Sequence, residues 1–381
     1  MAKLNFIDIF CGAGGLSCGL EQSGMRCLLG IDHDQQAIKT FEANHKYAKS
    51  FSGKIEDLTK TKLKKLLDNK KIDLVVGGPP CQGFSTVGKG DPNDNRNKLF
   101  LEFLRIVKEL KPSYIVIENV TGLLAKKNEK TLKKILKYFQ DLGYRLDVQV
   151  LSAHNYGVAE KRRRTIIIGS KINQTVIFPK ITHDTIIGKK EVPSKTVNDV
   201  IKNLKTSDRM IYNHDIESAM IKKELDLKRI KRIPEGCGIR YKKDEKQFLT
   251  TALKLGINWE EMPEQRLRQT KYFRLNGKLP SPTIMTHRHS YYHPTEHRYL
   301  TQREAAAIQS FPNDFIFTGS ISAQWRQIGN AVPPLLGKAI GKAILKMHKN
   351  AASEIKAPAK KKTVKEIKKV RSSAFKYKSK R

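Results

Sequence analysis

The first 170 residues alternate between short apolar runs and longer segments in which apolar residues recur every three or four positions. The short runs predict buried strands, and the longer segments predict amphipathic helices. The strands are expected at 4–10, 26–32, 72–78 and 113–120, with two more around a charged loop at 144–170. The helices are expected up to residue 20, at 35–45, and around 99–110 and 132–142.

This alternation predicts an α/β fold with a doubly wound, mostly parallel sheet. In such sheets ligands bind where the strands end. From about 171 to 285 the alternation is lost, and basic residues are interleaved with aromatic ones, which predicts a smaller irregular domain. An amphipathic helix follows at 300–311, and 327–348 is interpreted as a loop and a final helix.

The chain therefore divides into four parts. We expect a first domain at 1–175, an irregular domain with its hinge at 176–321, a returning part of the first domain at 322–350, and a tail at 351–381. The Lys, Ala, Pro and Ser composition of the tail predicts disorder. It could serve as a nuclear-targeting signal or a nonspecific DNA-binding arm, or it could only aid solubility.

The charge of the chain changes the picture of its partners. The formal net charge is +36, from 73 basic and 37 acidic side chains. The tail has 12 basic and 2 acidic residues, which leaves +26 for residues 1–350. Such a field attracts a polyanion, and nucleic acid is the first candidate, although a solubilising role would give the same composition. No apolar run approaches a membrane span, and the first residues lack the pattern of a signal peptide.

The turn after the first strand is a candidate nucleoside site. Glycines at 12, 14 and 15 follow Phe10, and Asp32 ends the next strand. Glycines let a ligand approach the backbone, and an acid at this spacing commonly holds ribose hydroxyls. The dinucleotide spacing G-x-G-x-x-G is incomplete, so NAD, S-adenosylmethionine and a purely structural turn all remain open.

Three further features carry candidate chemistry. Cys81 follows two prolines at the end of the third strand, as expected for a presented nucleophile, although a structural turn would look the same. Glu118 ends the next strand, where it could stay protonated or form an ion pair. Arg162, Arg163 and Arg164 form a basic cluster.

The five cysteines include no C-x-x-C pair, so neither a disulfide framework nor a four-cysteine zinc site is expected.

Together these segments resemble the DNA cytosine-5 methyltransferase family. The similarity covers about residues 4–345 in the family's order. The matching blocks are DIFCGAGG, PPCQGFS, DNRNKLF, ENV, YGVAEKRRR, REAAAIQSFP and QIGNAVPP. The resemblance implies the methyltransferase fold, S-adenosylmethionine as cofactor, and a target-recognition role for the irregular domain.

The resemblance also implies a mechanism and site residues. A cytosine in double-stranded DNA would be flipped out, Cys81 would add to C6, and C5 would receive the methyl group. The implied catalytic residues are Cys81, Glu118, Arg162 and Arg164. The implied cofactor-binding residues are Phe10, Gly12, Gly14, Gly15, Asp32, Ile55, Pro79 and Asn330. The candidate substrate contacts are Ser85, Asn119, Arg266, Arg268, Lys271, Arg274 and Arg288.

The chain departs from the family pattern at three places that bear on this interpretation. Glu160 stands where Gln is usual, Ala159 stands where Pro is usual, and Lys54 replaces an acid expected to contact the adenine. Two alternatives remain: a tRNA cytosine-5 methyltransferase of the same fold, and a catalytically silent DNA-binding protein. The tRNA branch resembles PPCQPF, whereas this chain has Gly83 in that motif.

The expected partner is double-stranded DNA, with no membrane and no metal. The histidines of HRHSYYHPTEH are interrupted by Pro294 and are interpreted as part of a hinge that contacts DNA. We expect a monomer with a cognate restriction endonuclease as a candidate partner. The expected location is the cytoplasm in a prokaryote, with the nucleus or a viral factory as alternatives given the basic tail.

Overall fold

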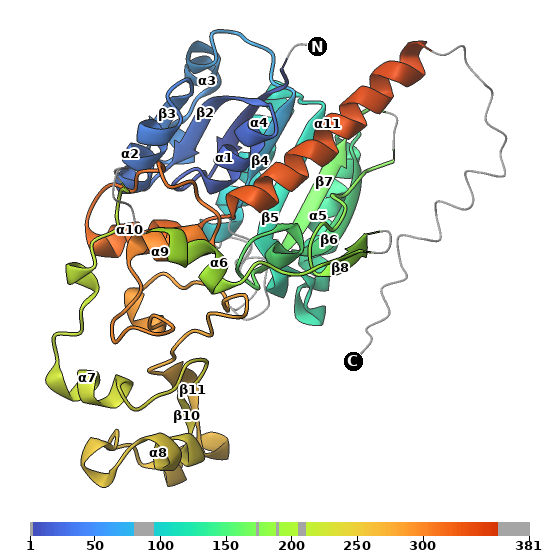
Figure 1. Cartoon of the computed structure of the whole chain (residues 1–381). Helices are drawn as coiled ribbons and strands as arrows, with labels where there is room; N and C mark the ends of the chain where they lie inside the picture. The colour runs from blue at the N-terminus through green and yellow to red at the C-terminus, as the bar shows by residue number, and fades with distance from the viewer. Residues whose placement is uncertain (1–2, 80–94, 173–174, 188–189, 205–210, 357–381) are drawn as a thin grey trace.

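The computed structural model describes residues 3–79, 95–172, 175–187, 190–204 and 211–356 (Figure 1). Its centre is a seven-stranded sheet in the order β3-β2-β1-β4-β5-β7-β6. The strands are β1 (Asn5–Ile9), β2 (Arg26–Asp32), β3 (Lys49–Ser52), β4 (Leu74–Gly77), β5 (Tyr114–Val120), β6 (Arg145–Ser152) and β7 (Arg163–Ser170). All neighbours are parallel except that β7 runs antiparallel to β5 and β6. The predicted α/β fold with a mostly parallel sheet is confirmed.

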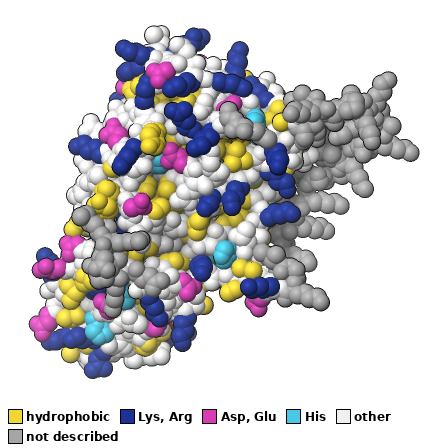
Figure 2. All heavy atoms as spheres, turned by 45° about the horizontal axis from the view of Figure 1, so that its top comes forward, with side chains coloured by type: hydrophobic (Ala, Val, Ile, Leu, Met, Phe, Trp, Pro, Cys, Tyr) yellow, Lys and Arg dark blue, Asp and Glu magenta, His cyan; other side chains and the backbone are white. Residues whose placement is uncertain are grey.

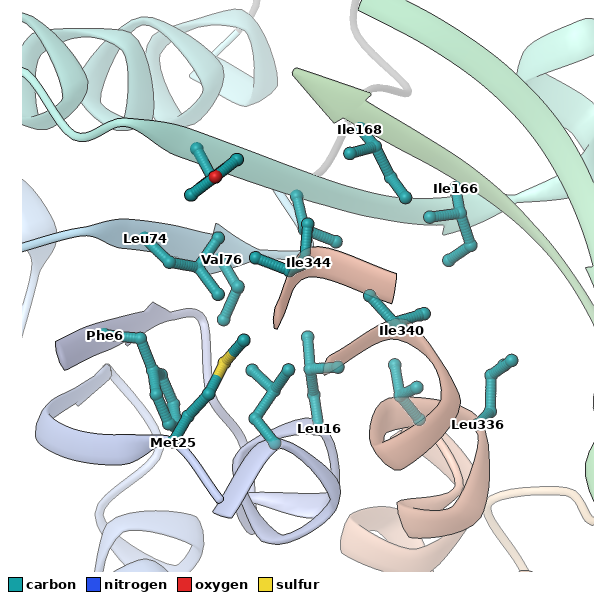
Figure 3. Close-up of a cluster of buried hydrophobic side chains, with 14 of the residues drawn as sticks. Phe6, Leu16, Met25, Leu74, Val76, Ile166, Ile168, Leu336, Ile340 and Ile344 are labelled. Atoms are coloured by element: carbon teal, nitrogen blue, oxygen red, sulfur yellow. The ribbon is translucent and has the colours of Figure 1, made fainter. Parts of the chain in front are cut away.

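Helices cover both faces of this sheet. One face packs against α1 (Gly15–Gln22), α2 (Gln35–Asn44) and α11 (Pro334–Lys356). Figure 3 shows this cluster, with Phe6 and Val76 from the sheet facing Leu16 of α1 and Ile340 of α11. The other face packs against α3 (Lys60–Leu66), α4 (Asn95–Leu110) and α5 (Glu129–Asp141). Helices on both faces explain why the central strands are almost wholly apolar.

The C-terminal helix α11 completes the first domain by packing closely on α1. A Cβ atom added to Gly19 would lie 2.1 Å from the carbonyl oxygen of Pro334. Gly337 faces the same contact, where a Cβ atom would lie 2.9 Å from the carbonyl oxygen of Leu16. Glycines on both helices therefore let their backbones approach, and residues more than 300 positions apart share one core.

A second layer of helices lies between the sheet and the irregular domain (Figure 1). It contains α6 (Val197–Ile201), α9 (Gln302–Ile308) and α10 (Ile321–Asn330), packed around Phe311 and Trp325. The predicted helix at 300–311 is present as α9. The interpretation of 327–330 as loop is wrong, because these residues form the last turn of α10. That helix starts upstream at the Ser320 cap, whose hydroxyl accepts from the Ala323 amide.

The irregular domain has its own small core around Ile230, Ile239 and Trp259. It contains α7 (Glu224–Ile230), α8 (Lys242–Phe248) and an antiparallel pair, β10 (Ile239–Tyr241) and β11 (Arg266–Lys271). A separate hairpin, β8 (Thr185–Ile187) with β9 (Lys190–Val192), precedes it. Loops and single 3₁₀ turns make up most of the rest, as the loss of periodicity predicts.

Three details differ from the sequence-based prediction. Strand β3 and helix α3 were not predicted, because the strand is short with a single large apolar residue, Phe51, and the helix is rich in lysine. Helix α11 continues to Lys356, so it includes the first residues of the segment expected as a tail. Across the described residues, every helix is too short or too polar to span a membrane.

Candidate active site

A cavity of about 490 Å³ opens at the carboxyl ends of β1, β2 and β5. Parallel strands bring their ends to one edge of the sheet, so residues far apart in sequence meet there. The lining includes Phe10, Gly12, Asp32, Glu118, Arg326 and Asn330. Five of these six are sequence-predicted site residues, and the structure brings them together around one space.

The glycine turn is fixed by the carboxylate of Asp32. Its Oδ2 atom accepts from the Gly12 amide at 2.8 Å, and its Oδ1 atom accepts from the Asp34 amide at 2.9 Å. Phe10 has φ 64° and Gly12 has φ 52°, so the backbone turns sharply away from β1. The turn thereby brings Phe10 and Gly12 to the lining of the cavity.

The glycines of the turn differ in what they permit. A Cβ atom on Gly14, which has φ 86°, would lie 2.2 Å from the Nε2 atom of His45 and 2.9 Å from the Phe41 ring. A Cβ atom on Gly12 would have no neighbour within 4 Å. Gly14 and Gly15 therefore serve the packing behind the turn and do not line the cavity, whereas Gly12 does.

Asp8 is a site residue that the sequence analysis missed. It lies in β1, lines the cavity and is only 2% exposed. Burial raises the pKa of Asp8 to about 7; the hydrogen bond from the Ser17 hydroxyl opposes this rise, and the charges of Asp32 and Glu118 add to it. The Ser17 oxygen lies 2.6 Å from Oδ2 of Asp8. An acid inside the otherwise apolar run FIDIF was the available signal.

Glu118, which lines the cavity, forms an ion pair with Arg164. The Nε atom of Arg164 lies 2.7 Å from Oε1 of Glu118, and each side chain is 15% exposed. Burial raises the pKa of Glu118, while the charges of Arg164 and Arg162 oppose that rise. Burial and the two guanidinium groups thus act on the pKa of Glu118 in opposite directions.

The end of β5 also fixes the start of the segment that contains Cys81. The side-chain amide of Asn119 donates to the carbonyl oxygen of Pro79 at 2.9 Å. A Cβ atom on Gly78 would lie 3.2 Å from Oε2 of Glu118. The chain thus enters the PPCQGFS motif beside Glu118. Cys81 and Ser85 themselves lie outside the described residues.

The remaining predicted residues of this site are placed differently. Arg162 is 1% exposed and donates its Nη2 to the carbonyl oxygen of Gly329 at 2.8 Å. Ile55 and Pro79 are buried and do not line the cavity, whereas Asn330 is exposed at the end of α10 and does. Arg326 also lines the cavity and was not predicted, because one arginine on a helix carries no pattern of its own.

Comparisons with known proteins now bear on this geometry. A family model described as C-5 cytosine-specific DNA methylase matches residues 4–346. Type II methyltransferase M1.HphI of Haemophilus parahaemolyticus is 34% identical over 360 residues, covering 91% of this chain and 88% of that protein. Type II methyltransferase M.PspPI of a Psychrobacter species is 35% identical over 373 residues, covering 92% and 81%.

Two solved structures have folds similar to that of this chain. A DNA modification methyltransferase encoded within an E. coli prophage has a TM-score of 0.64 and 28% identity, covering 91% of this chain and 100% of that chain. The S. pombe Dnmt2 methyltransferase shares the fold, with a TM-score of 0.58 at 18% identity over 92% of this chain and 99% of that one.

The chain belongs to the C-5 cytosine-specific DNA methylase family. It is therefore a DNA cytosine-5 methyltransferase, and the curated relatives named above are type II methyltransferases. The family resemblance deduced from the sequence motifs is confirmed.

The irregular domain of this methyltransferase has a cleft of about 1060 Å³. Its lining includes Arg240, Arg268, Gln269, Lys271, His287 and Ser290. Arg268 and Lys271 are exposed on β11, while Arg266 and Arg288 are partly buried. Lys and Arg outnumber Asp and Glu across the face of the molecule in Figure 2. A basic cleft of this kind suits a polyanion.

One predicted DNA contact has a different place in the methyltransferase. Arg274 is 3% exposed, and its guanidinium donates to carbonyl oxygens of Ile230, Ile233 and Glu296 within the irregular domain. Its donors serve the domain's own loops, so the expectation of a DNA contact is corrected to a structural role. The basic-aromatic composition around it could not separate a buried arginine from an exposed one.

Two other features bear on the sequence interpretation. Lys54 is exposed at the start of a short 3₁₀ helix (Ile55–Asp57). It does not line the cavity of about 490 Å³ at the strand ends, which we call the cofactor-sized cavity. His293 is buried, and its Nδ1 atom accepts from the amides of Thr295 and Glu296. Among the described residues there is no cluster of three or more His, Cys, Asp or Glu suited to a metal ion.

Proposed function

We propose that this enzyme transfers the methyl group of S-adenosylmethionine to C5 of a cytosine within a short recognition sequence in double-stranded DNA. The observation that carries the proposal is the meeting of Glu118, Arg164 and the entry to the Cys81 segment at the edge of one cavity. Activation of a cytosine ring requires an acid, a cation and a nucleophile, and Glu118, Arg164 and the Cys81 segment would supply these three parts.

The cavity fits this cofactor by the chemistry of its lining. Asp32 offers carboxylate oxygens to ribose hydroxyls, and Phe10 offers an aromatic face to the adenine. The charges of Asp32 and Glu118 add to the raised pKa of Asp8, and a positive sulfonium group beside these acids would offset that effect. Ile55 and Pro79 would support the adenine side from behind. When bound, S-adenosylmethionine supplies an electrophilic methyl group.

Glu118 and the arginines would hold the target cytosine. A protonated Glu118 can donate to N3 of the ring, which makes C6 more electrophilic. Arg164, which pairs with Glu118, would then contact the ring oxygen of the cytosine. Arg162 would fix the position of the arginine motif through its hydrogen bond to the carbonyl oxygen of Gly329. Extrusion of the base from the duplex costs a few kcal/mol of stacking and pairing, which these contacts would offset.

Cys81 would act as the nucleophile. Its thiolate would add to C6, and the electron pair displaced to C5 would form the bond to the methyl group. The bond from that methyl group to the sulfonium sulfur would break at the same time and leave a neutral thioether. A base then removes the C5 proton, and the electron pair left behind expels Cys81 as thiolate. Ser85 and Asn119 would lie close to the base or its phosphate.

The irregular domain would read the DNA sequence. Arg268 and Lys271 of β11 are both exposed and line the cleft, where they can contact phosphates or base edges. Arg266 and Arg288 would add contacts at the margins. The domain boundaries predicted above remain part of this proposal, as do a monomeric state, a cognate restriction endonuclease and a cytoplasmic location, which the bacterial relatives support.

The test is base-resolution mapping of 5-methylcytosine. Unmethylated bacterial DNA and a tRNA pool are treated together with S-adenosylmethionine, using the wild type and Cys81→Ala. We expect methylation at one short DNA sequence, absent with Cys81→Ala. Marks confined to tRNA would identify a tRNA methyltransferase, and an equally active Cys81→Ala would remove Cys81 from the mechanism. No marks in either substrate would indicate a silent DNA-binding protein.

A further inference from the structure

A short segment of the irregular domain lies against the arginine motif of the catalytic domain. We call residues 281–286 the hinge segment; they directly precede the stretch 287–297 that the sequence predicts as a DNA-contacting hinge. The Ser281 amide donates to the carbonyl oxygen of Ala159, and the Lys161 amide donates to the carbonyl oxygen of Ser281, both at 2.8 Å. These backbone bonds form an isolated parallel bridge between Glu160 and Ser281. The hinge segment is therefore attached beside Arg162 and Arg164, of which Arg164 is proposed above to contact the base.

Glu160 makes the side-chain link in this attachment. It is 0% exposed, and its Oε1 atom accepts from the Ile284 amide at 2.6 Å. The same oxygen lies 3.6 Å from Nη1 of Arg162, a distance that gives charge attraction without a direct hydrogen bond. Burial raises the pKa of Glu160, and the charge of Arg162 opposes that rise.

Arg162 carries the link to a third part of the molecule. Its Nη2 atom donates to the carbonyl oxygen of Gly329 in the last turn of α10. A Cβ atom on Gly329 would lie 2.6 Å from backbone atoms of Met285 and Thr286. The arginine motif, the hinge segment and the end of α10 thus meet around one buried ion pair. Asn330, which lines the cofactor-sized cavity, follows directly.

We propose that Glu160 is a positioning residue that couples the hinge segment of the DNA-reading domain to Arg162, so that docking of that domain sets the arginines at the target base. This assignment rests on the proposed function. The bond from Ile284 supplies the coupling, because it fixes the side chain of Glu160, whose Oε1 atom faces Nη1 of Arg162. The hinge backbone thus sets the position of that oxygen, and the position matters more to the coupling than the charge.

The prediction separates the hydrogen bond from the charge. Glu160→Gln keeps an oxygen for the Ile284 amide and removes the charge. Glu160→Asp keeps the charge but withdraws the oxygen by one methylene. Glu160→Ala removes both. We expect Glu160→Gln to stay within about threefold of the wild-type rate, and the other two to lose at least about tenfold, since small misplacements of catalytic groups reduce rates strongly.

The measurement is the single-turnover methylation rate at saturating DNA and S-adenosylmethionine, with the affinity for S-adenosylhomocysteine measured by calorimetry. Affinity for S-adenosylhomocysteine should change less than about threefold in all variants, because Glu160 does not line the cofactor-sized cavity.

The matched control is Glu245→Ala. Glu245 is also buried and accepts from Trp259 Nε1 and the Leu255 amide at 2.7 Å, but in the core of the irregular domain. Its rate at saturating DNA should match the wild type.

Three results would each overturn the coupling. In the first, Glu160→Ala and Glu160→Asp methylate DNA at the wild-type rate. In the second, Glu160→Gln is as slow as Glu160→Ala, and in the third, the control Glu245→Ala is as slow as Glu160→Ala and Glu160→Asp. If Glu160→Ala does not fold, the comparison of Gln with Asp decides. A wild type that methylates no DNA overturns the proposed function itself, which distinguishes that failure from failure of the coupling.

Discussion

The Nε atom of Arg164 lies 2.7 Å from Oε1 of Glu118, on neighbouring antiparallel strands. The register pairs Val120 with Arg164 and Glu118 with Ile166, so the two side chains lie diagonally across the sheet. Their spacing is therefore fixed by backbone hydrogen bonds rather than by mobile loops. That rigidity suits a pair whose task is to hold one base in one orientation.

The first prediction concerns the pH dependence of methylation. If protonated Glu118 donates to the base, the rate falls as pH rises through its raised pKa. Removal of the Arg164 charge raises the pKa of Glu118 further, so Arg164→Ala should shift that falling limb to higher pH. Glu118→Gln should abolish the limb and lower the rate by about 100-fold or more. Single-turnover rates across the pH range test this, and a limb that Arg164→Ala does not move would contradict it.

A second prediction concerns Asp8 and stability. Its pKa is raised from 3.8 to about 7 by burial, so the folded state holds a proton that the unfolded chain releases. The free energy of unfolding should therefore fall as pH rises between about 4 and 7, by up to ~1.4 kcal/mol per pH unit from this group. Asp8→Asn should lack that slope. Urea unfolding without cofactor measures it, with exposed Asp147→Asn as control. Equal slopes in wild type and Asp8→Asn would refute the assignment.

The glycine turn gives a third prediction. Gly14→Ala combines a positive φ with overlap against His45 and Phe41, so it should lower the free energy of unfolding by about 2–4 kcal/mol. Gly24→Ala has a positive φ but no neighbour, and should cost only about 1–2 kcal/mol. Gly12→Ala should resemble Gly24→Ala in stability while weakening S-adenosylhomocysteine binding. Chemical denaturation and calorimetry distinguish the three, and equal costs would exclude the packing argument.

The basic residues of the irregular domain give a fourth prediction. Arg268→Ala with Lys271→Ala should flatten the log-log salt dependence of DNA binding, by about 0.9 for each lost phosphate contact. Arg274→Ala should leave that slope unchanged and lower the free energy of unfolding by about 2 kcal/mol or more, because buried carbonyl oxygens lose their donor. Binding titrations at several salt concentrations and denaturation test the pair. A reduced slope in Arg274→Ala would restore it as a DNA contact.

The sequence by itself determined the sheet, the positions of most of its strands and helices, and the edge at which chemistry gathers. Hydrophobic periodicity is local, so the strand at 113–120 and the helix at 300–311 were visible in short windows. Because parallel strands end at one edge, Gly12, Asp32 and Glu118 could be placed together without knowing any contact.

The tertiary structure alone decided which of the charged residues are partners and which are buried. Glu160 meets Ile284 across 124 positions, and Arg162 meets Gly329 across 167. Neither contact has a periodic signature, because each joins the arginine motif to a segment more than 100 positions away, in the irregular domain for Ile284 and in α10 for Gly329. Arg274 and Arg268 look alike in the sequence, yet one is buried on its own domain's carbonyl oxygens and the other is exposed in a cleft. Burial sets the cost of an unpaired charge, and only packing between distant segments sets burial.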